Sequence, residues 1–526
     1  MMRGRPLILL AVLLVGCTGS PAASSPAPFA TAPPAAAITP SPSTIPATEK
    51  SSPTATLISK LATAIIPPTS PPCSPLPAPC STYTSQPGDT LAVIARHFRL
   101  DSPLRIVCII PNADTCPPLT DPDDIETTHR AFDANRLLPP GTRLIIPVTT
   151  SAEPWARLLP DSEVVFSAAG ADFDTAGYLS AANGYLAAHR QYLMMNGWNT
   201  AADVINLVAL ENSINPRLLV ALLEYQCQCV RGPAEHPEPF MGAQDAARHD
   251  LYGQLVWAVF HLSNGYYGWR AGTLTGVTLT DGTLIPLNPN FNAGTAALYN
   301  LFAQLMGTAE FTGATDPRGG FASLYQEMFG DPWLREISLF PAGTASPSLT
   351  LPFAPGMIWS YTGGPHPAFE GNGPLASLDF APASAAAGCL PTTAWVTAVA
   401  DGLVVRSGFG LVIQDLDGDG SELTGWNIMY LHIGTEGRVA EGTYLKTGDR
   451  VGQPSCEGGR ANGTHLHIAR KLNGEWIPAG SGPLPFNLAG WIAGDGAEPY
   501  QGTLARKGVV ITACTCSWRQ GWIENE

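Results

Sequence analysis

The spacing of hydrophobic positions changes along the chain, and each change predicts a different kind of structure. An apolar run from Leu7 to Val15 follows the basic start Met1-Met2-Arg3-Gly4-Arg5. This run is too short for a mature membrane-spanning helix, so we expect a secretion signal over residues 1–17. Residues 18–80 are mainly Ala, Pro, Ser and Thr, which bury too little apolar surface to offset the entropy of ordering. They predict a disordered, extended stalk.

Residues 81–149 show the order strand, helix, helix, strand. Asp89 or Thr90 is placed to cap the first helix, and the apolar residues of that helix share one face: Leu91, Ile94, Ala95 and Phe98. The last strand follows Asn135 and ends near Pro147. The pattern predicts a small α+β module.

Residues 160–345 carry a helical pattern. Tyr178, Ala182, Tyr185, His189 and Tyr192 recur at three- and four-residue spacing, as along one stripe of a helix. They predict a mostly helical middle domain. We interpret His189, and His261 further along, as core or groove histidines rather than metal ligands.

The stretch from Asn215 to Gln226 is weakly similar to the helix that carries the catalytic acid of soluble lytic transglycosylases, so a lysozyme-like fold is one alternative here. The glutamate of that family would fall on Gln226, whose amide cannot donate a proton as a carboxylic acid does. Glu224 is the nearest carboxylate, but two residues along a helix is roughly 200° of rotation. We therefore expect a domain that positions substrate or packs, without glycan-cleaving activity.

Short β-branched runs separated by glycine, such as residues 393–399 and 402–405, predict an antiparallel β domain over residues 350–490. A C-terminal extension, residues 491–526, would follow it. At 526 residues the chain exceeds what one hydrophobic core supports, which also favours a multidomain protein. The formal charge of −15 leaves no basic surface for a run of phosphates, so nucleic acid is excluded as a partner.

The cysteines indicate an exported protein. Leu14-Val15-Gly16-Cys17 resembles the bacterial lipobox, which implies that Cys17 is acylated and anchors the chain to the outer face of a membrane. The remaining ten of the 11 cysteines are expected to form disulfides, since export places them where disulfides persist. Local spacing suggests Cys73 with Cys80 and Cys108 with Cys116, and Cys389 with Cys456 in the β domain. The pairs Cys227/Cys229 and Cys514/Cys516 leave a redox or metal motif as a less favoured alternative.

The strongest chemical signal is Gly463-Thr464-His465-Leu466-His467, because alternation along a strand sends both imidazoles to one face. A catalytic zinc site needs three imidazole or carboxylate ligands and leaves a fourth position for water. Three further candidates lie upstream in the same domain: His366, Asp379 and His432. Together these residues predict a zinc site.

Two family resemblances follow from these motifs. The segments Tyr83–Phe98 and Asn135–Pro147 resemble a LysM module, which implies binding of N-acetylglucosamine-containing glycan by the loop residues Gly88, Asp89, Thr90 and Asn135. Residues 352–485 resemble the lysostaphin-type (LytM-like) zinc endopeptidases, in particular their β-lytic branch. That resemblance implies one Zn²⁺ held by His366, Asp379 and His467, with His432 and His465 as acid and base.

These resemblances imply a lipid-anchored, extracytoplasmic peptidoglycan endopeptidase that cleaves cross-bridge or stem peptides through an activated water molecule. Two alternatives remain: a catalytically silent wall-binding regulator, although such relatives usually lack the zinc ligands, and an extracellular protease of glycine-rich proteins. The loop Asp415-Leu416-Asp417-Gly418-Asp419-Gly420 opens like a calcium-binding EF-hand loop, but its twelfth position is Trp426 instead of glutamate. A polar turn is favoured there over Ca²⁺ at Asp415, Asp417 and Asp419.

Overall fold

The computed structural model describes residues 80–108, 133–148, 156–194, 196–234, 237–245, 247–369, 372–383, 385, 387–515 and 519–526. All of these residues belong to one compact unit. The expected signal, the lipidation site Cys17, nearly all of the expected stalk and the cysteines Cys73, Cys116 and Cys516 lie outside the described residues. No helix within the described ranges is long and apolar enough to cross a membrane.

The N-terminal module has the predicted first strand, first helix and last strand. Strand β1 (Ser81–Thr84) pairs antiparallel with β3 (Arg143–Ile146), and β3 also pairs with β2 (Val107–Cys108). Helix α1 (Leu91–His97) begins at Thr90, whose side chain accepts a hydrogen bond from the Val93 amide, so Thr90 rather than Asp89 is the cap. The predicted apolar face is buried. The expected second helix falls on residues outside the described ranges.

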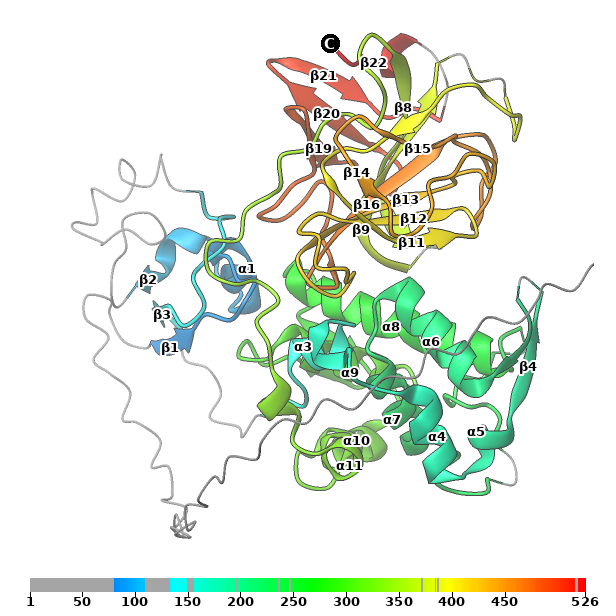
Figure 1. The fold of residues 1–526 in the computed structure, drawn as a ribbon. Helices are drawn as coiled ribbons and strands as arrows, with labels where there is room; N and C mark the ends of the chain where they lie inside the picture. Colours follow the sequence, from blue (N-terminus) through cyan, green and yellow to red (C-terminus); the bar gives the residue numbers. More distant parts are fainter. Residues whose placement is uncertain are drawn as a thin grey trace, which may run out of the picture. The chain divides into compact units, whose positions relative to one another are not determined.

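The middle domain is mostly helical, as predicted, and appears in cyan and green in Figure 1. Its central helix α7 begins at the cap Asn215 with Pro216 in the first turn, and it ends at Gln228 in the left-handed region. Every residue of α7 from Pro216 to Glu224 is buried, so the other helices pack around it. The helices are α3 (Asp161–Val164), α4 (Thr175–Ala182), α5 (Tyr185–Ala188), α6 (Ala201–Asn212), α7 (Pro216–Cys227), α8 (Leu251–Arg270), α9 (Ala293–Ala303), α10 (Thr308–Thr315) and α11 (Phe321–Phe329).

The predicted single stripe from Tyr178 to Tyr192 is wrong. Helix α4 ends at Asn183, which has a φ of 53°, and α5 adds only four residues. The chain then becomes extended and forms the hairpin of β4 (Arg190–Leu193) and β5 (Gly197–Thr200). Cross-strand pairing of Tyr192 with Trp198 replaces the helical hydrogen bonds that the spacing had suggested. A second hairpin joins β6 (Gly276–Thr278) to β7 (Leu284–Pro286).

The C-terminal part is the predicted antiparallel β domain. Its main sheet has nine strands in the order β14-β11-β12-β13-β16-β9-β8-β22, with β17 paired to β16. Figure 1 shows most of these strands in yellow and orange, and β22 in red near the C-terminus. The strands are β8 (Ile358–Phe369), β9 (Asn372–Pro382), β11 (Gly402–Gly408), β12 (Leu411–Asp415), β13 (Trp426–Leu431), β14 (Tyr444–Leu445), β16 (Leu466–Leu472), β17 (Glu475–Trp476) and β22 (Trp522–Glu524). A smaller pair joins β10 (Val396–Thr397) to β15 (Arg450–Gly452).

The two faces of the main sheet differ in what they contact. Leu466 and Ile468 of β16 point into the main core of the β domain. His467 and Ala469 alternate with them, so they point to the opposite face. Residues directly across from each other share a face, which places Leu431 of β13 beside His467 and Met429 beside Ala469. This second face carries both the predicted chemistry and a smaller apolar cluster.

Residues 491–526, expected as a C-terminal extension, pack into the β domain. Strands β18 (Asn487–Leu488), β19 (Trp491–Asp495), β20 (Gly502–Arg506) and β21 (Val509–Thr512) form a four-stranded sheet. β22 adds to the main sheet beside β8. Leu504 and Ile523 are buried in the same core as Leu466.

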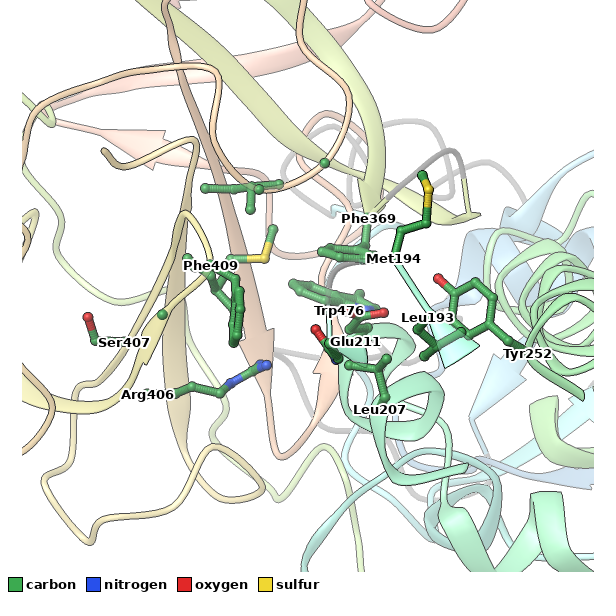
Figure 2. Close-up of a pocket in the computed structure, with 17 residues that line it drawn as sticks. Leu193, Met194, Leu207, Glu211, Tyr252, Phe369, Arg406, Ser407, Phe409 and Trp476 are labelled. Atoms are coloured by element: carbon green, nitrogen blue, oxygen red, sulfur yellow. The ribbon is translucent and has the colours of Figure 1, made fainter. Parts of the chain in front are cut away.

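The middle domain contacts the second face of the main sheet. The Tyr266 hydroxyl of α8 donates to Glu475 over 2.7 Å, and the Tyr267 hydroxyl accepts from the Trp476 amide over 3.1 Å. Beside these contacts, the β4–β5 hairpin and α6 border a cavity of about 440 Å³ whose other side is the β domain (Figure 2).

Candidate metal centre and active site

Three neighbouring strands bring the predicted zinc ligands together. Asp379 on β9 lies directly across from His467 on β16, and His366 comes from β8. The β8–β9 pairing shifts register between Gly363, which lies across from Asp379, and His366, which lies across from Ser377. Ser377 and Asp379 are two residues apart on β9, so His366 and Asp379 share one face of the sheet. A Cβ atom on Gly363 would lie 2.5 Å from the Asp379 carboxylate, so glycine is required at this position.

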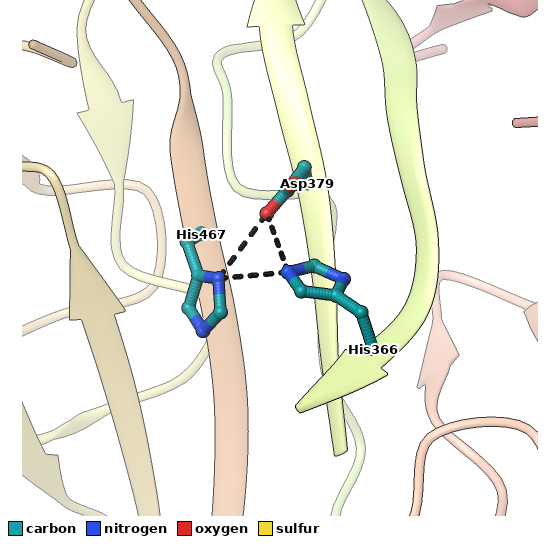
Figure 3. A group of neighbouring side chains, drawn as sticks. All are labelled: His366, Asp379 and His467. Atoms are coloured by element: carbon teal, nitrogen blue, oxygen red, sulfur yellow. Dashed lines mark hydrogen bonds and ion pairs between the residues drawn. The ribbon is translucent and has the colours of Figure 1, made fainter. Parts of the chain in front are cut away.

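The ligand atoms converge on one point (Figure 3). His366 Nε2 lies 3.0 Å from His467 Nδ1 and 3.2 Å from Asp379 Oδ1, and His467 Nδ1 lies 3.3 Å from Asp379 Oδ1. All three residues are buried. Two imidazole nitrogens and a carboxylate oxygen form the donor set of a catalytic zinc site with one position left open.

The hydrogen bonds behind the histidine rings show that the set fits a cation. His366 Nδ1 faces the Gly364 carbonyl at 2.7 Å, and His467 Nε2 faces the Ala368 carbonyl at 3.0 Å. A carbonyl oxygen only accepts, so both of these nitrogens carry hydrogen. In the neutral rings the opposite nitrogens carry lone pairs that face each other at 3.0 Å, an arrangement that a metal ion between them stabilises.

Asp379 supports the same conclusion. Its Oδ1 atom is buried and accepts no hydrogen bond from any described group, although it points at the two histidines. Burial alone would raise the pKa of Asp379, but the neighbouring imidazoles His366, His467 and His465 hold that pKa well below its usual range. The carboxylate is therefore ionised and has an oxygen free to bind a metal.

His432 and His465 lie beside the metal ligands, as the resemblance implied. His432 directly follows β13 with a φ of 64°, and His465 directly precedes β16. Their ring centroids are 4.5 Å apart, and His465 Nε2 is 3.8 Å from Asp379 Oδ1. Burial lowers the pKa of His432 to about 4, and the nearby rings of His465 and His467 contribute. His432 is therefore neutral at pH 7.

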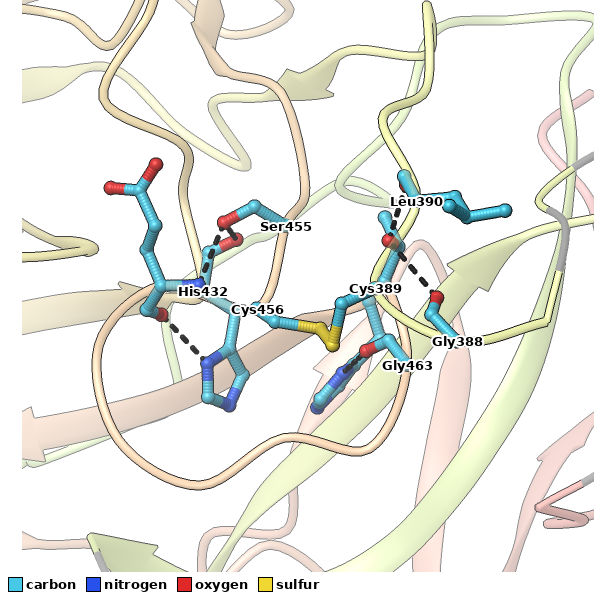
Figure 4. Close-up of a disulfide and its surroundings, with 10 residues drawn as sticks. Gly388, Cys389, Leu390, His432, Ser455, Cys456 and Gly463 are labelled. Atoms are coloured by element: carbon cyan, nitrogen blue, oxygen red, sulfur yellow. Dashed lines mark hydrogen bonds between the residues drawn. A yellow bond between two sulfur atoms is a disulfide. The ribbon is translucent and has the colours of Figure 1, made fainter. Parts of the chain in front are cut away.

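Backbone carbonyls orient both of these rings (Figure 4). His432 Nδ1 donates to the Glu457 carbonyl over 2.9 Å, and His465 Nδ1 donates to the Gly463 carbonyl over 2.7 Å. Their Nε2 atoms are left as acceptors that can take a proton from water or return one to a leaving group.

The disulfide Cys389–Cys456 links the two loops that hold these histidines, and it confirms the pairing suggested by the sequence (Figure 4). Next to Cys456, the Ser455 amide donates to the His432 carbonyl over 2.7 Å. Next to Cys389, the Gly388 carbonyl accepts from the Thr464 amide over 3.1 Å. The bridge therefore restrains both loops from behind.

The site opens into a cavity of about 740 Å³ that is lined by all five predicted residues and by Arg460, Thr362 and Tyr500. Sequence reasoning missed Tyr500, whose ring stacks on His366 with centroids 4.2 Å apart. Its position is fixed by the hydrogen bond from the Tyr500 amide to the Pro365 carbonyl. No motif surrounds Tyr500, so only its tertiary position reveals it.

The four predicted glycan-binding residues have different surroundings. Asp89 is buried, accepts hydrogen bonds from the Tyr83 hydroxyl and the Gln86 amide, and has its pKa raised to about 6 by burial. Thr90 is buried as the helix cap. Gly88 lies against Arg270 of the middle domain. Asn135 is exposed. Glycan binding by these residues stays a prediction.

The remaining predicted candidates have structural partners. Glu224 accepts hydrogen bonds from the amides of Val230 and Arg231 and from the Arg231 guanidinium over 2.9 Å, so its carboxylate holds the end of α7. His189 packs against Phe240, and His261 packs against Trp257. Among the described residues neither histidine belongs to a cluster of potential metal ligands. Cys227 and Cys229 form a disulfide with each other.

The acidic loop is a tight turn between β12 and β13. Asp415 accepts hydrogen bonds from the amides of Asp417, Gly418 and Gly420. The hydrogen bond to Asp415 raises the pKa of Asp417. The three carboxylates lie close enough together for a cation. These hydrogen bonds form the polar turn that the sequence favoured, and a calcium ion stays the less favoured alternative.

Comparisons with known proteins agree with this architecture. Residues 157–342 match the family model described as "LasA, N-terminal domain". The chain is 24% identical over 298 residues to protease LasA of Pseudomonas aeruginosa. This match covers 52% of the present chain and 68% of that protein.

Two solved structures are also similar to part of the chain. The M23 metalloprotease pseudoalterin from the deep sea is 23% identical and has a TM-score of 0.27. The match covers 32% of this chain and 96% of the pseudoalterin chain. The catalytic domain of lysostaphin from Staphylococcus simulans is 23% identical and has a TM-score of 0.17. The match covers 23% of this chain and 86% of the lysostaphin chain. With the LasA match across the middle domain and the His-Asp-His set on the sheet, the chain is a zinc metalloendopeptidase similar to protease LasA.

Proposed function

We propose that this endopeptidase hydrolyses the peptide part of bacterial peptidoglycan, at cross-bridge or stem peptides. The observation that supports this proposal most directly is the site itself. His366, Asp379 and His467 present three metal-donor atoms within hydrogen-bonding distance of one another, and two more histidines flank them. A silent wall-binding regulator has no need for a donor set of this kind.

His366, Asp379 and His467 would hold the zinc ion. When bound, zinc supplies a Lewis acid that activates a water molecule and polarises the scissile carbonyl. Backbone carbonyls hold the Nδ1 atoms of His432 and His465, which leaves both Nε2 atoms for chemistry: one would accept the proton of the attacking water while the other orients the reacting groups. The proton then passes to the leaving amine. No side chain forms a covalent intermediate in this scheme.

The wall-directed part of the proposal rests on the N-terminal features. A LysM module over residues 81–149 would bind N-acetylglucosamine-containing glycan, and acylation of Cys17 would tether the chain to the outer face of a membrane through the stalk of residues 18–80. Tethering raises the local concentration of substrate at the site. These assignments come from sequence motifs.

The test is release of dye from labelled peptidoglycan by the zinc-loaded mature chain, with and without a chelator. We expect release that the chelator abolishes and added zinc restores. Mass spectrometry of the released muropeptides then identifies the scissile bond. Release that is absent, or that persists in chelator, contradicts the proposal and supports a regulator.

A further inference from the structure

The cavity between the middle domain and the main sheet continues the face that carries the metal centre. Leu431 lines this cavity, precedes His432 in the chain and lies directly across from His467. Gly458 also lines it and follows Glu457, whose carbonyl orients His432. A peptide bound at the metal centre therefore needs only a few residues to reach the cavity.

The middle domain forms the opposite wall. Leu193 and Met194 come from the β4–β5 hairpin, Leu207 from α6 and Tyr252 from α8. Figure 2 shows Phe409 of the β domain on one side and Leu193, Met194 and Tyr252 on the other, with Phe369 and Trp476 between them. The volume of about 440 Å³ lies within the range of built ligand sites. Neither domain forms this cavity alone.

The lining favours an apolar occupant over a sugar. Most lining side chains are aliphatic, aromatic or methionine. Two of the polar ones are already paired: Arg406 with Glu422 over 2.9 Å, and the Ser407 hydroxyl with the Val439 carbonyl over 2.6 Å. A pyranose ring needs several hydrogen-bond partners, whereas an apolar side chain needs none. Methionine side chains also adapt to apolar groups of different shape.

The mouth of the cavity is accessible. Met194 is 93% exposed and Phe409 is 70% exposed, although both are large apolar residues at the edge of an apolar cavity. Exposed apolar surface that continues an active-site face is typical of a binding groove.

We infer that this cavity is a substrate subsite that takes a bulky apolar side chain of the peptide, a few residues from the scissile bond. The middle domain thereby contributes directly to substrate selection. The inference rests on the proposed peptidase function. It adds to that function a preference for peptides that carry an apolar residue a few positions before or after the scissile bond.

The test uses quenched fluorescent peptides of glycine and alanine, each with a single leucine moved along the sequence, and the zinc-loaded chain. We expect leucine at one or two positions to raise kcat/KM roughly tenfold over the parent peptide. In Met194→Gln and Phe409→Asn this gain, measured against the cleavage of the parent peptide by the same variant, falls at least severalfold. Asn suits the φ of 50° at Phe409, and both residues are exposed, so neither change disturbs the fold.

Leu334→Gln is the matched control, because Leu334 is 84% exposed on the same domain and does not line the cavity. The Leu334→Gln variant should keep the full increase in kcat/KM that leucine brings to the wild type. The inference is overturned if leucine brings no gain at any position, or if both cavity variants keep it. It is also overturned if chito-oligosaccharide competes with the leucine peptide in wild type and not in the variants, since the occupant is then a sugar.

A second readout separates this inference from the proposed function. Fluorescence anisotropy of labelled leucine and parent peptides on the zinc-stripped chain measures binding without turnover. If no peptide is cleaved but the leucine peptide binds more tightly in wild type than in Met194→Gln, the peptidase proposal fails and the subsite stands. Equal binding of the two peptides, with cleavage intact, overturns the subsite alone.

Discussion

At the scale of single residues, the metal centre depends on atoms that have no other partner. Asp379 Oδ1 is buried, and His366 Nε2 and His467 Nδ1 lie 3.2 Å and 3.3 Å from it. The Gly364 and Ala368 carbonyls fix the tautomers of the two rings. Each ligand therefore has one defined atom for the metal, and replacing any ligand removes that atom.

We predict that His467→Ala abolishes zinc retention and activity together. Two remaining donors hold zinc poorly, because catalytic sites use three. Metal content after dialysis, measured by mass spectrometry, should fall from about one zinc per chain to near zero, and hydrolysis of labelled peptidoglycan should stop. A variant that keeps both metal and activity shows that His467 is not a ligand.

His465→Ala should behave differently. Its Nε2 atom flanks the ligand set without completing it, so zinc content should stay near that of wild type. Removal of a general acid or base typically slows a reaction by roughly 10²- to 10⁴-fold. The measurement is kcat on a quenched peptide beside metal content on the same sample. Loss of the metal in this variant would place His465 among the ligands instead.

At the scale of elements, loops and helix contacts hold the parts of the chain in place. The disulfide Cys389–Cys456 joins loops far apart in sequence, and those loops orient His432 and His465. Helix α1 contacts α8 through His97, whose ring stacks on Trp269 with centroids 3.7 Å apart and bonds to the Trp269 carbonyl at 3.0 Å. Both contacts lead to measurable predictions.

The double variant Cys389→Ser/Cys456→Ser should lower activity while zinc stays bound, because the ligands come from strands and the flanking histidines are held by loops. The loss of a bridge across 67 residues should also lower the free energy of unfolding by about 2–5 kcal/mol. Chemical denaturation and kcat measure the two effects. Cys227→Ser/Cys229→Ser, in the middle domain, is the control and should leave kcat unchanged. Equal activity loss in both pairs would contradict a specific role of the loop bridge.

His97 predicts a dependence of stability on pH. Burial lowers its pKa from 6.5 to about 4, so the folded chain keeps His97 neutral while the unfolded chain protonates it. The neutral His97 ring makes its full contribution to the free energy of unfolding above pH 6.5. As the pH falls from 6.5 toward 4, that free energy decreases by about 3 kcal/mol. Urea denaturation at pH 7 and pH 4.5 should show a smaller loss of stability in His97→Phe, which keeps an aromatic ring and cannot titrate. The same loss in both proteins would show that His97 is not the group responsible.

At the scale of the whole molecule, the middle domain and the β domain share a buried charged contact. Arg270 of α8 pairs with Glu475 over 3.0 Å and with Asp161 over 3.1 Å, and its side chain also donates to the Pro87 carbonyl of the N-terminal module. Burial raises the pKa of Glu475, and Arg270 opposes that shift. The Arg270 side chain therefore contacts the N-terminal module, the middle domain and the β domain.

Arg270→Met should destabilise the protein by about 3–5 kcal/mol, because it leaves the buried Glu475 carboxylate and the half-buried Asp161 carboxylate without their cationic partner. Calorimetry should show separate transitions for the middle and β domains where wild type has one. Arg318→Met is the control: Arg318 is 92% exposed in its pair with Asp316, so its loss should change stability little. Equal effects of the two changes would mean that the contact adds nothing to the coupling of the domains.

The sequence by itself determined the features that neighbouring residues encode. The start of α1 at Asp89 or Thr90, the buried face of α1, the mostly helical middle domain and the antiparallel β domain all follow from local spacing and were confirmed; the structure chose Thr90 as the cap. The five residues of the site could be named because two of them alternate on one strand and the others match a family pattern. Local spacing misled at Tyr178–Tyr192, where Asn183 ends the helix and cross-strand pairing takes over.

Only the tertiary structure decided how distant residues meet. His366 and His467 are separated by 101 residues, and their 3.0 Å contact depends on the register of three strands. Tyr500 stacks on His366, and the middle domain closes one side of the apolar cavity, without any signal in the spacing of residues. Short-range patterns report hydrogen bonding and burial within an element, whereas register and domain contacts depend on packing across the whole chain.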